Sequence, residues 1–282
     1  MDVLCRWAGR DGGAGDVVTD IRAPLFVPAN RPERFAKAAA SGADAVILDL
    51  EDAVAAEAKD RARAALDTGF TDLPVIVRIN ACGTEWHEAD VAAVAALRPA
   101  GVILPKAEDA EMVAGVAAAL DGVPVIALVE TARGLANARA MAAAGVARLA
   151  FGSVDFCADL ACAHLREVLL PVRLELVLAS RLAGIAAPID GVTVQLDDLS
   201  VSHDDAAHAR ALGMTGKLCI HPRQITEVRR AFAPTEKEID WARRVIASGD
   251  GAASVDGAMV DEPVRIRARA ILAEAGSGAG RS

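Results

Sequence analysis

Apolar runs that end abruptly at polar residues recur along this chain, and they constrain its fold more than any other feature. Two lie mid-sequence: PVIALVE at Pro124–Glu130 and RLAFGSVD at Arg148–Asp155. A run without polar alternation predicts a strand of a parallel sheet that helices cover on both faces. Glu130 and Asp155 would then lie at the carboxyl edge of the sheet, where α/β folds place their chemistry.

Each carboxylate also has a plainer interpretation. Glu130 could cap the helix that follows it, and Asp155 could be an acid of a surface loop. Two carboxylates on neighbouring strands could instead share one hard divalent cation, and Mg²⁺ is the most plausible one. The choice depends on whether the rest of the chain repeats the pattern.

Six further runs repeat it, and Ala-rich segments with helical spacing separate most of them. Eight strand signals alternating with helical segments predict an α/β fold, the (β/α)₈ TIM barrel. A doubly wound open sheet is the alternative, and the lack of a GxGxxG or P-loop motif after the first strands weakens it. The further runs are Pro24–Ala29, Ala45–Leu50, Pro74–Ile79, Gly101–Lys106, Gly191–Leu196 and Gly216–His221, and helical segments include Glu108–Leu120, Thr131–Ala144, Leu170–Ala186 and Asp204–Leu212.

Polar residues end most of the predicted strands. In a barrel they would all face the mouth at the carboxyl ends of the strands, so we expect one shared active site there. In chain order they are Asp49, Glu51, Asp52, Arg78, Asn80, Lys106, Glu130, Asp155, Gln195, Asp197 and His221.

Composition excludes several classes of function. The chain has 282 residues, 53% hydrophobic and only 3% aromatic, which fits one large α/β domain or two small ones with an aliphatic core. A formal charge of -9 argues against a general nucleic-acid binder, although local Arg and Lys could still bind an anionic ligand. No apolar run approaches the ~20 residues of a membrane span. We therefore expect neither nucleic acid nor membrane as a partner.

The cysteines and the chain ends complete this outline. Five cysteines without a CxxC pair predict no zinc site and fit a reducing cytoplasm. No apolar segment of a signal peptide is visible near the start. We expect a disordered segment 1–20, a barrel 21–232, a helical extension 233–275 and a disordered tail 276–282. The cysteines are Cys5, Cys82, Cys157, Cys162 and Cys219.

Several motifs occur in the order and spacing of one known family: PLFVPANRPERFAKA, ILDLEDAV, VRIN, LPKAE, VETARGL, FGSVDF, GKLCIHPRQI and DGAMVDEPV. Together they resemble the citrate lyase beta-subunit family of acyl-CoA lyases, in the HpcH/HpaI aldolase superfamily, from about residue 22 to 272. The resemblance implies a Mg²⁺-dependent (β/α)₈ lyase. Such enzymes cleave or form citryl-, malyl- or citramalyl-CoA, with acetyl-CoA or a similar thioester and a 2-oxo acid as products.

The resemblance also implies roles for single residues. Glu130 and Asp155 match the metal ligands, and Arg78 matches the substrate arginine, which could otherwise form an ion pair with Glu51 or Asp52. Glu130 and Arg78 would also contact the substrate. The backbone N–H groups of Gly152 and Ser153 could hold its carboxylate.

Other polar residues would support that site. Glu51 and Asp52 would orient Arg78, Lys106 or metal-bound water, or else cap a helix. Lys106 is expected to be structural rather than a Schiff-base lysine, because the metal already serves as the electron sink. Lys217 and His221 would lie at the mouth near CoA, or would make purely structural hydrogen bonds. The candidates for CoA contact are Arg22, Arg31, Lys217 and His221.

An extension follows the eighth strand, with a helical stretch at Pro234–Ile246 and a Gly-rich segment at Ser248–Ala253 that would permit a helical lid. The resemblance implies that Asp261 enters the active site of a neighbouring subunit as an acid–base group. That requires a homo-oligomer, a trimer or hexamer. Alternatively, Asp261 caps the last helix, with Pro263 in its first turn.

Three other functions remain open at this point. The same barrel and metal pair serve malyl-CoA thioesterases and CoA-independent pyruvate aldolases. A non-catalytic acyl-carrier-binding subunit is disfavoured, because every metal and arginine position is filled.

Overall fold

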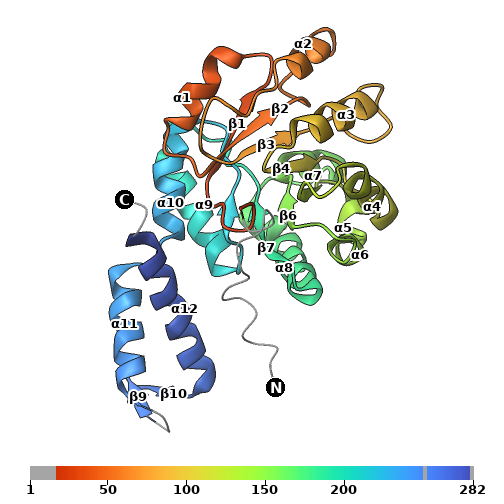
Figure 1. Cartoon of the computed structure of the whole chain (residues 1–282). Coiled ribbons are helices and arrows are strands. Elements are labelled where there is room, and N and C mark those ends of the chain that lie inside the picture. The colour runs from red at the N-terminus through yellow and green to blue at the C-terminus, as the bar shows by residue number, and fades with distance from the viewer. Residues whose placement is uncertain (1–16, 250–252, 280–282) are drawn as a thin grey trace. The chain divides into compact units, whose positions relative to one another are not determined.

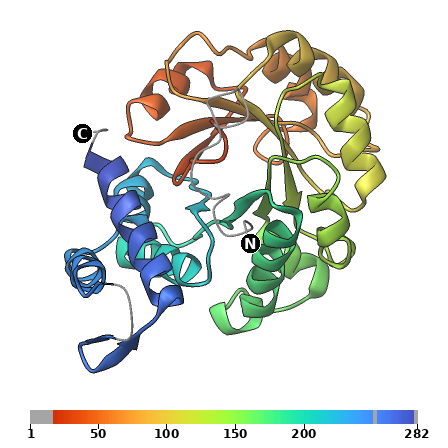
Figure 2. The same cartoon turned by 60° about the horizontal axis from the view of Figure 1, so that its bottom comes forward.

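Eight parallel strands form a barrel in the computed structural model, which describes residues 17–249 and 253–279. Each strand pairs with the next one in sequence, and hydrogen bonds from Phe26 N to Cys219 O and from Cys219 N to Pro24 O join the last strand to the first. Helices surround the strands (Figure 1; Figure 2), so the predicted (β/α)₈ barrel is confirmed. The strands are β1 Pro24–Pro28, β2 Ala45–Asp49, β3 Val75–Arg78, β4 Gly101–Leu104, β5 Val125–Val129, β6 Arg148–Phe151, β7 Ala186–Asp190 and β8 Gly216–Lys217.

Side-chain caps start several helices directly after the strand-end loops. Asp109 accepts the Met112 N–H at α4, and Thr131 accepts the Gly134 N–H at α5. Such caps satisfy backbone donors that have no intrahelical partner. The helical elements up to residue 232 are η1 Pro32–Arg34, α1 Phe35–Ala39, η2 Ala56–Ala58, α2 Lys59–Ala64, α3 His87–Leu97, α4 Ala110–Ala119, α5 Ala132–Ala136, α6 Ala138–Ala142, α7 Ser153–Leu160, α8 Arg166–Ala183, α9 Leu199–Ala211, η3 Pro222–Gln224 and α10 Ile225–Phe232.

Branched aliphatic side chains fill the barrel. Their positions along the strands show which polar residues point towards its mouth. Ile47, Ile76 and Leu128 belong to one buried cluster. Because side chains alternate between the two faces of a strand, the residue two positions further along each chain segment points the same way. Those residues are Asp49, Arg78 and Glu130.

The opposite end of the barrel is closed by Arg148. Its buried guanidinium donates to the backbone oxygens of Val18 (3.2 Å), Ile21 (2.9 Å) and Ala187 (2.5 Å). Burial lowers the pKa of this group. Residues 17–20 form a turn with Val18 buried in the core, whereas 1–16, including Cys5, lie outside the described residues.

The seventh strand is not the predicted one. The sequence favoured Gly191–Leu196, but β7 is Ala186–Asp190 and α8 ends at Ala183. Pro188 hid the strand, because proline cannot donate to a sheet and argues against a central strand. The β-branched residues of GVTVQL attracted the prediction instead. As a consequence, Gln195 and Asp197 are exposed in a loop and do not end a strand, and Asp190 is the carboxylate that does.

A second compact unit begins after Arg229. It contains α11 Glu236–Ala247, β9 Ala253–Val255, β10 Ala258–Val260 and α12 Glu262–Ala279. Its own core includes Val245, Val260 and Ile271. The hairpin β9–β10 was not predicted, although Asp256-Gly257 in its turn, both with positive φ, is a strong hairpin signal. Residues 280–282 of the expected tail lie outside the described part of the chain.

Within the described ranges, no helix is both long enough and apolar enough to cross a bilayer.

Candidate active site

Arg78 lies at the mouth and is surrounded by the carboxylates of three residues. Its Nε and Nη2 each donate to an oxygen of Asp49 at 2.7 Å, and its Nη1 lies 3.0 Å from Glu51 Oε2 and 3.6 Å from Asp52 Oδ2. Burial opposes the charge, but the hydrogen bond and charge of Asp49 raise the pKa of Arg78 above its ordinary value. Arg78 therefore does form the ion pair with Glu51 and Asp52 that was considered as an alternative, but its principal partner is Asp49.

Glu51 links Arg78 to Lys106. Its Oε1 accepts a 2.6 Å hydrogen bond from Lys106 Nζ, while Oε2 faces Arg78. Burial raises the pKa of Glu51, and the charge of Arg78 opposes that rise. Lys106 has a positive φ of 47°, and its backbone N–H donates to Glu130 Oε1 at 2.7 Å. The ammonium of Lys106 is thus engaged in the ion pair with Glu51.

Glu130 is buried, and one of its two carboxylate oxygens is hydrogen-bonded. Among the described residues, its Oε2 has no hydrogen-bond partner. Gly152 packs directly against it: a Cβ at Gly152 would lie 2.5 Å from Glu130 Cβ and closer still to Oε2, so only glycine fits. Burial and the charge of Glu51 raise the pKa of Glu130 to about 8. A buried carboxylate oxygen without a donor suits a bound cation.

Asp155 belongs to a helix and does not end a strand. Strand β6 ends at Phe151, and Asp155 lies half-buried in the first turn of α7. Its charge contributes to the raised pKa of Glu130. The Gly152 N–H already donates to Val129 O, so the Ser153 N–H is the available donor of the expected pair.

Sequence reasoning missed the groups that hold the β2 end in place. Lys59 Nζ donates to the backbone oxygens of Leu50 and Glu51 and to Asn80 Oδ1, each at 2.7 Å. Asp90, fully buried, accepts from the Asn80 backbone and side chain. Lys59 and Asp90 lie on helices, so the pattern of polar residues at strand ends could not indicate them.

Lys217 makes the structural hydrogen bonds considered as its alternative role, and neither Lys217 nor Arg22 lies at the mouth. Lys217 is buried, with Nζ 3.0 Å from Asp190 Oδ2 and 2.6 Å from Gly191 O. Its neighbour Leu218 fills the barrel, so alternation directs Lys217 outward. Arg22 precedes β1 and therefore lies at the amino end of the barrel.

His221 and Arg31 do lie on the mouth side. His221 Nδ1 accepts the Arg223 N–H at 3.1 Å and completes a capping box with Gln224, which is the structural role considered as its alternative. Arg31 is exposed after β1 and pairs with Glu33.

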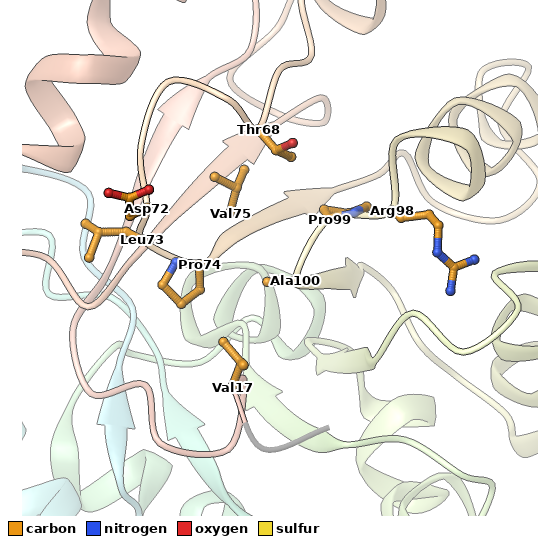
Figure 3. A pocket seen from close by; sticks show the side chains of 9 residues that line it. All are labelled: Val17, Thr68, Asp72, Leu73, Pro74, Val75, Arg98, Pro99 and Ala100. Atoms are coloured by element: carbon orange, nitrogen blue, oxygen red, sulfur yellow. The ribbon is translucent and has the colours of Figure 1, made fainter. Parts of the chain in front are cut away.

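A separate cavity of about 220 Å³ opens at the amino ends of β3 and β4 (Figure 3). Its lining includes Asp72 and Arg98 but no group of carboxylates. The mouth is therefore the better candidate. Within the described ranges, no three His, Cys, Asp or Glu side chains converge closely enough to form a complete metal site. An ion held by Glu130 and Asp155 would need water or substrate oxygens as further ligands, as Mg²⁺ commonly does.

Comparison with known proteins gives a consistent picture. The family model described as HpcH/HpaI aldolase/citrate lyase matches residues 22–222. A citrate lyase subunit beta-like protein of Mycobacterium tuberculosis is 43% identical over 264 residues, covering 89% of this chain and 94% of that protein. A (3S)-malyl-CoA thioesterase of Cereibacter sphaeroides is 34% identical over 269 residues, covering 90% and 94%.

Solved structures of a relative resemble this chain in fold as well as in sequence. The Mycobacterium tuberculosis protein CitE in complex with magnesium, acetoacetate and coenzyme A has a TM-score of 0.81 and 40% identity, covering 91% of this chain and 98% of that one. The same protein with magnesium and pyruvate has a TM-score of 0.74 and 36% identity, covering 91% and 99%.

We predict that Glu130 makes the metal-free protein less stable as the pH rises. A carboxyl whose pKa is raised on folding, here from 4.5 to about 8, destabilises the folded state increasingly across that interval, by at most about 1.4 kcal/mol per pH unit. Glu130→Gln removes this dependence. After treatment with a chelator, the variant should match the wild type below pH 4.5 and melt at a higher temperature near pH 8.5.

Thermal melts across this pH range test the prediction, with Glu167→Gln at an exposed position of α8 as the control. A melting difference that does not change with pH would show that Glu130 titrates normally.

Proposed function

The chain belongs to the HpcH/HpaI aldolase/citrate lyase family, and from that premise we propose that it is a Mg²⁺-dependent carbon–carbon lyase of a 3-hydroxyacyl-CoA thioester. The substrate class is that of citryl-, malyl- or citramalyl-CoA, and the products are acetyl-CoA or a similar thioester and a 2-oxo acid. The observation that carries the proposal is the buried Oε2 of Glu130, which has no hydrogen-bond partner among the described residues and lies at the same mouth as Arg78. The charge of Asp155 also acts on this carboxylate.

Glu130 and Asp155 would hold the Mg²⁺. The charge of the mouth supports this assignment. Five carboxylates carry negative charge here when ionised: Asp49, Glu51, Asp52, Glu130 and Asp155. Arg78, Lys106 and Lys59 carry three positive charges, which leaves an excess of two negative charges, the charge that one divalent cation neutralises. Bound Mg²⁺ would polarise the carbonyl of the oxo acid.

Arg78 would stabilise the negative charge of the substrate carboxylate or of the developing enolate. Its two hydrogen bonds to Asp49 fix the guanidinium plane before a substrate arrives, so little reorganisation is needed during the reaction. Lys106 and Glu51 hold this arrangement through their own ion pair. The Ser153 N–H, at the start of α7, would bind the substrate carboxylate.

A thioesterase is the second candidate, because relatives with that name match 90% of the chain. The two activities share the metal and the arginine and differ in whether free CoA thiol is released. Direct product analysis therefore separates them.

We predict Mg²⁺-dependent turnover of at least one of malyl-, citramalyl- and citryl-CoA. Equimolar acyl-CoA and oxo acid without free thiol would identify a lyase, and release of thiol would identify a thioesterase. Glu130→Gln and Asp155→Asn should each lose at least about 100-fold in rate, because the metal supplies several kcal/mol of charge stabilisation. Both should also lose the Mg²⁺-induced rise in melting temperature.

Circular dichroism would confirm that both variants fold, and Glu167→Gln is again the control. Near-normal turnover with unchanged Mg²⁺ dependence in either variant would refute the metal assignment.

We predict that Arg78→Lys lowers kcat/KM by more than about 10-fold, or ~1.4 kcal/mol, because an ammonium cannot form the paired hydrogen bonds to Asp49. Arg139→Lys is a matched control. Arg139 also forms a two-pronged pair, with Glu175 at 2.6 and 2.9 Å, but on the exposed surface. A smaller loss at Arg78 would reduce its role to a structural ion pair.

We also propose that Asp261 supplies the acid–base group to the active site of a neighbouring subunit in a homo-oligomer, a trimer or hexamer. Asp261 is exposed and follows β10. It also accepts the Val264 N–H at 3.2 Å, so it caps α12 as considered above. Any test must therefore separate the two roles.

Asp261→Asn achieves this, because asparagine caps a helix as well as aspartate but cannot exchange a proton at neutral pH. We predict that it retains the melting temperature and Mg²⁺ binding and loses most activity. Mixing Asp261→Asn with Glu130→Gln subunits should restore part of the activity, since some mixed sites would contain both native residues. If subunit exchange is demonstrated and no activity returns, the shared site is wrong.

A further inference from the structure

Ser153 is confined on one side by the end of β7. It is the first residue of α7 and is buried, with only 1% of its surface exposed. A Cβ at Gly191 would lie 2.7 Å from Ser153 Cβ and closer still to its Oγ, so the serine occupies the space that a side chain there would need. This close approach leaves few directions open to the Ser153 hydroxyl.

One of those directions is taken by His164. Its Nε2 lies 2.9 Å from Ser153 Oγ. His164 belongs to the short connection between α7 and α8, which turns back through Ala161 in the left-handed conformation (φ 52°). The Cys162 N–H donates to Cys157 O at 3.0 Å and secures this turn. The connection thus returns the imidazole from the end of α7 to its start.

The surroundings of the imidazole disfavour its charged form. Burial, followed by the charges of Arg173 and Lys217, lowers the pKa of His164, and Asp205 and Asp190 oppose this only in part. A neutral imidazole can donate to or accept from a hydroxyl and an imidazolium can donate to one, so either form can hydrogen-bond to Ser153 Oγ. His164 as a whole remains exposed.

A small shift of Ser153 would displace both the expected metal ligands and the expected donor to the substrate carboxylate. The preceding residue, Gly152, packs against the carboxylate of Glu130, and Asp155 follows in the same helical turn. The N–H of Ser153 is the donor assigned above to the substrate carboxylate. Sites of this kind require their groups to stay within roughly 0.5 Å of the productive geometry.

We propose, on the basis of the proposed function, that His164 is a positioning residue that holds Ser153 and thereby orients the substrate-binding start of α7. The imidazole does not touch the reacting atoms. It limits the rotation of the Ser153 side chain and prevents the first turn of α7 from moving away from Glu130. Its loss should therefore weaken binding of the oxo acid more than it slows turnover.

The test uses two amides of different reach. In His164→Gln the amide reaches the place of Nε2 and can retain the hydrogen bond, whereas in His164→Asn it is too short. For condensation of the oxo acid with the acyl-CoA, we expect His164→Asn and His164→Ala to raise the KM of the oxo acid about 5-fold, the effect of one hydrogen bond. The kcat should change less than the KM, the KM of the acyl-CoA should stay unchanged, and His164→Gln should remain near the wild type.

A double-mutant cycle with Ser153→Ala tests whether the two residues act as one unit. The double variant should be no worse than either single variant. His203→Gln, on α9, is the control histidine. Additive effects, or an unchanged KM in His164→Asn, would overturn the proposal.

Calorimetric titration of the Mg²⁺-loaded protein with pyruvate gives a readout that does not require turnover. The dissociation constant should rise about 5-fold in His164→Asn and stay unchanged in His164→Gln. If the wild type binds pyruvate with this pattern but turns over no thioester, the proposed function fails and the positioning role stands. If the wild type is active and binding does not distinguish the two variants, the positioning role fails alone.

Discussion

The ion pairs that run from Asp49 through Arg78 and Glu51 to Lys106, together with the hydrogen bond from the Lys106 backbone N–H to Glu130, are the interactions on which the mouth of this barrel depends. Burying charges is costly unless each has a partner in good geometry. Here each cation contacts a carboxylate, yet Glu130 retains one bare oxygen. The network is therefore rigid where it must orient groups and incomplete where a ligand could bind.

Two glycines allow that network to come together. Gly152 lets Glu130 pack against the start of α7, and Gly191 leaves room for Ser153 beside β7. A methyl group at either position would collide with a side chain of the candidate site. Close approach of backbone to side chain, rather than flexibility, explains glycine at both positions.

Charges at β7 and β8 serve a different purpose. Asp190, paired with Arg173 and Lys217, lies between the barrel and its outer helices. This buried group fixes α8 on the strands that follow it and sets the electrostatic surroundings of His164. A charged residue near a strand end can thus face either the mouth or the helix layer, and alternation along the strand decides which.

The sequence by itself determined the barrel and seven of its eight strands, because unbroken apolar runs between helical segments are a strong local signal. It also identified Arg78, Glu130 and Lys106 as residues of one mouth, since they follow such runs. It missed β7, whose Pro188 contradicts local preference, and it left open whether Lys217 lies at the mouth or makes structural hydrogen bonds. Only the tertiary structure decided the partners: Asp49 for Arg78, His164 for Ser153 and Asp190 for Lys217. These contacts join residues on different elements, and the direction of a side chain depends on strand alternation and on closely packed neighbours that no local pattern specifies.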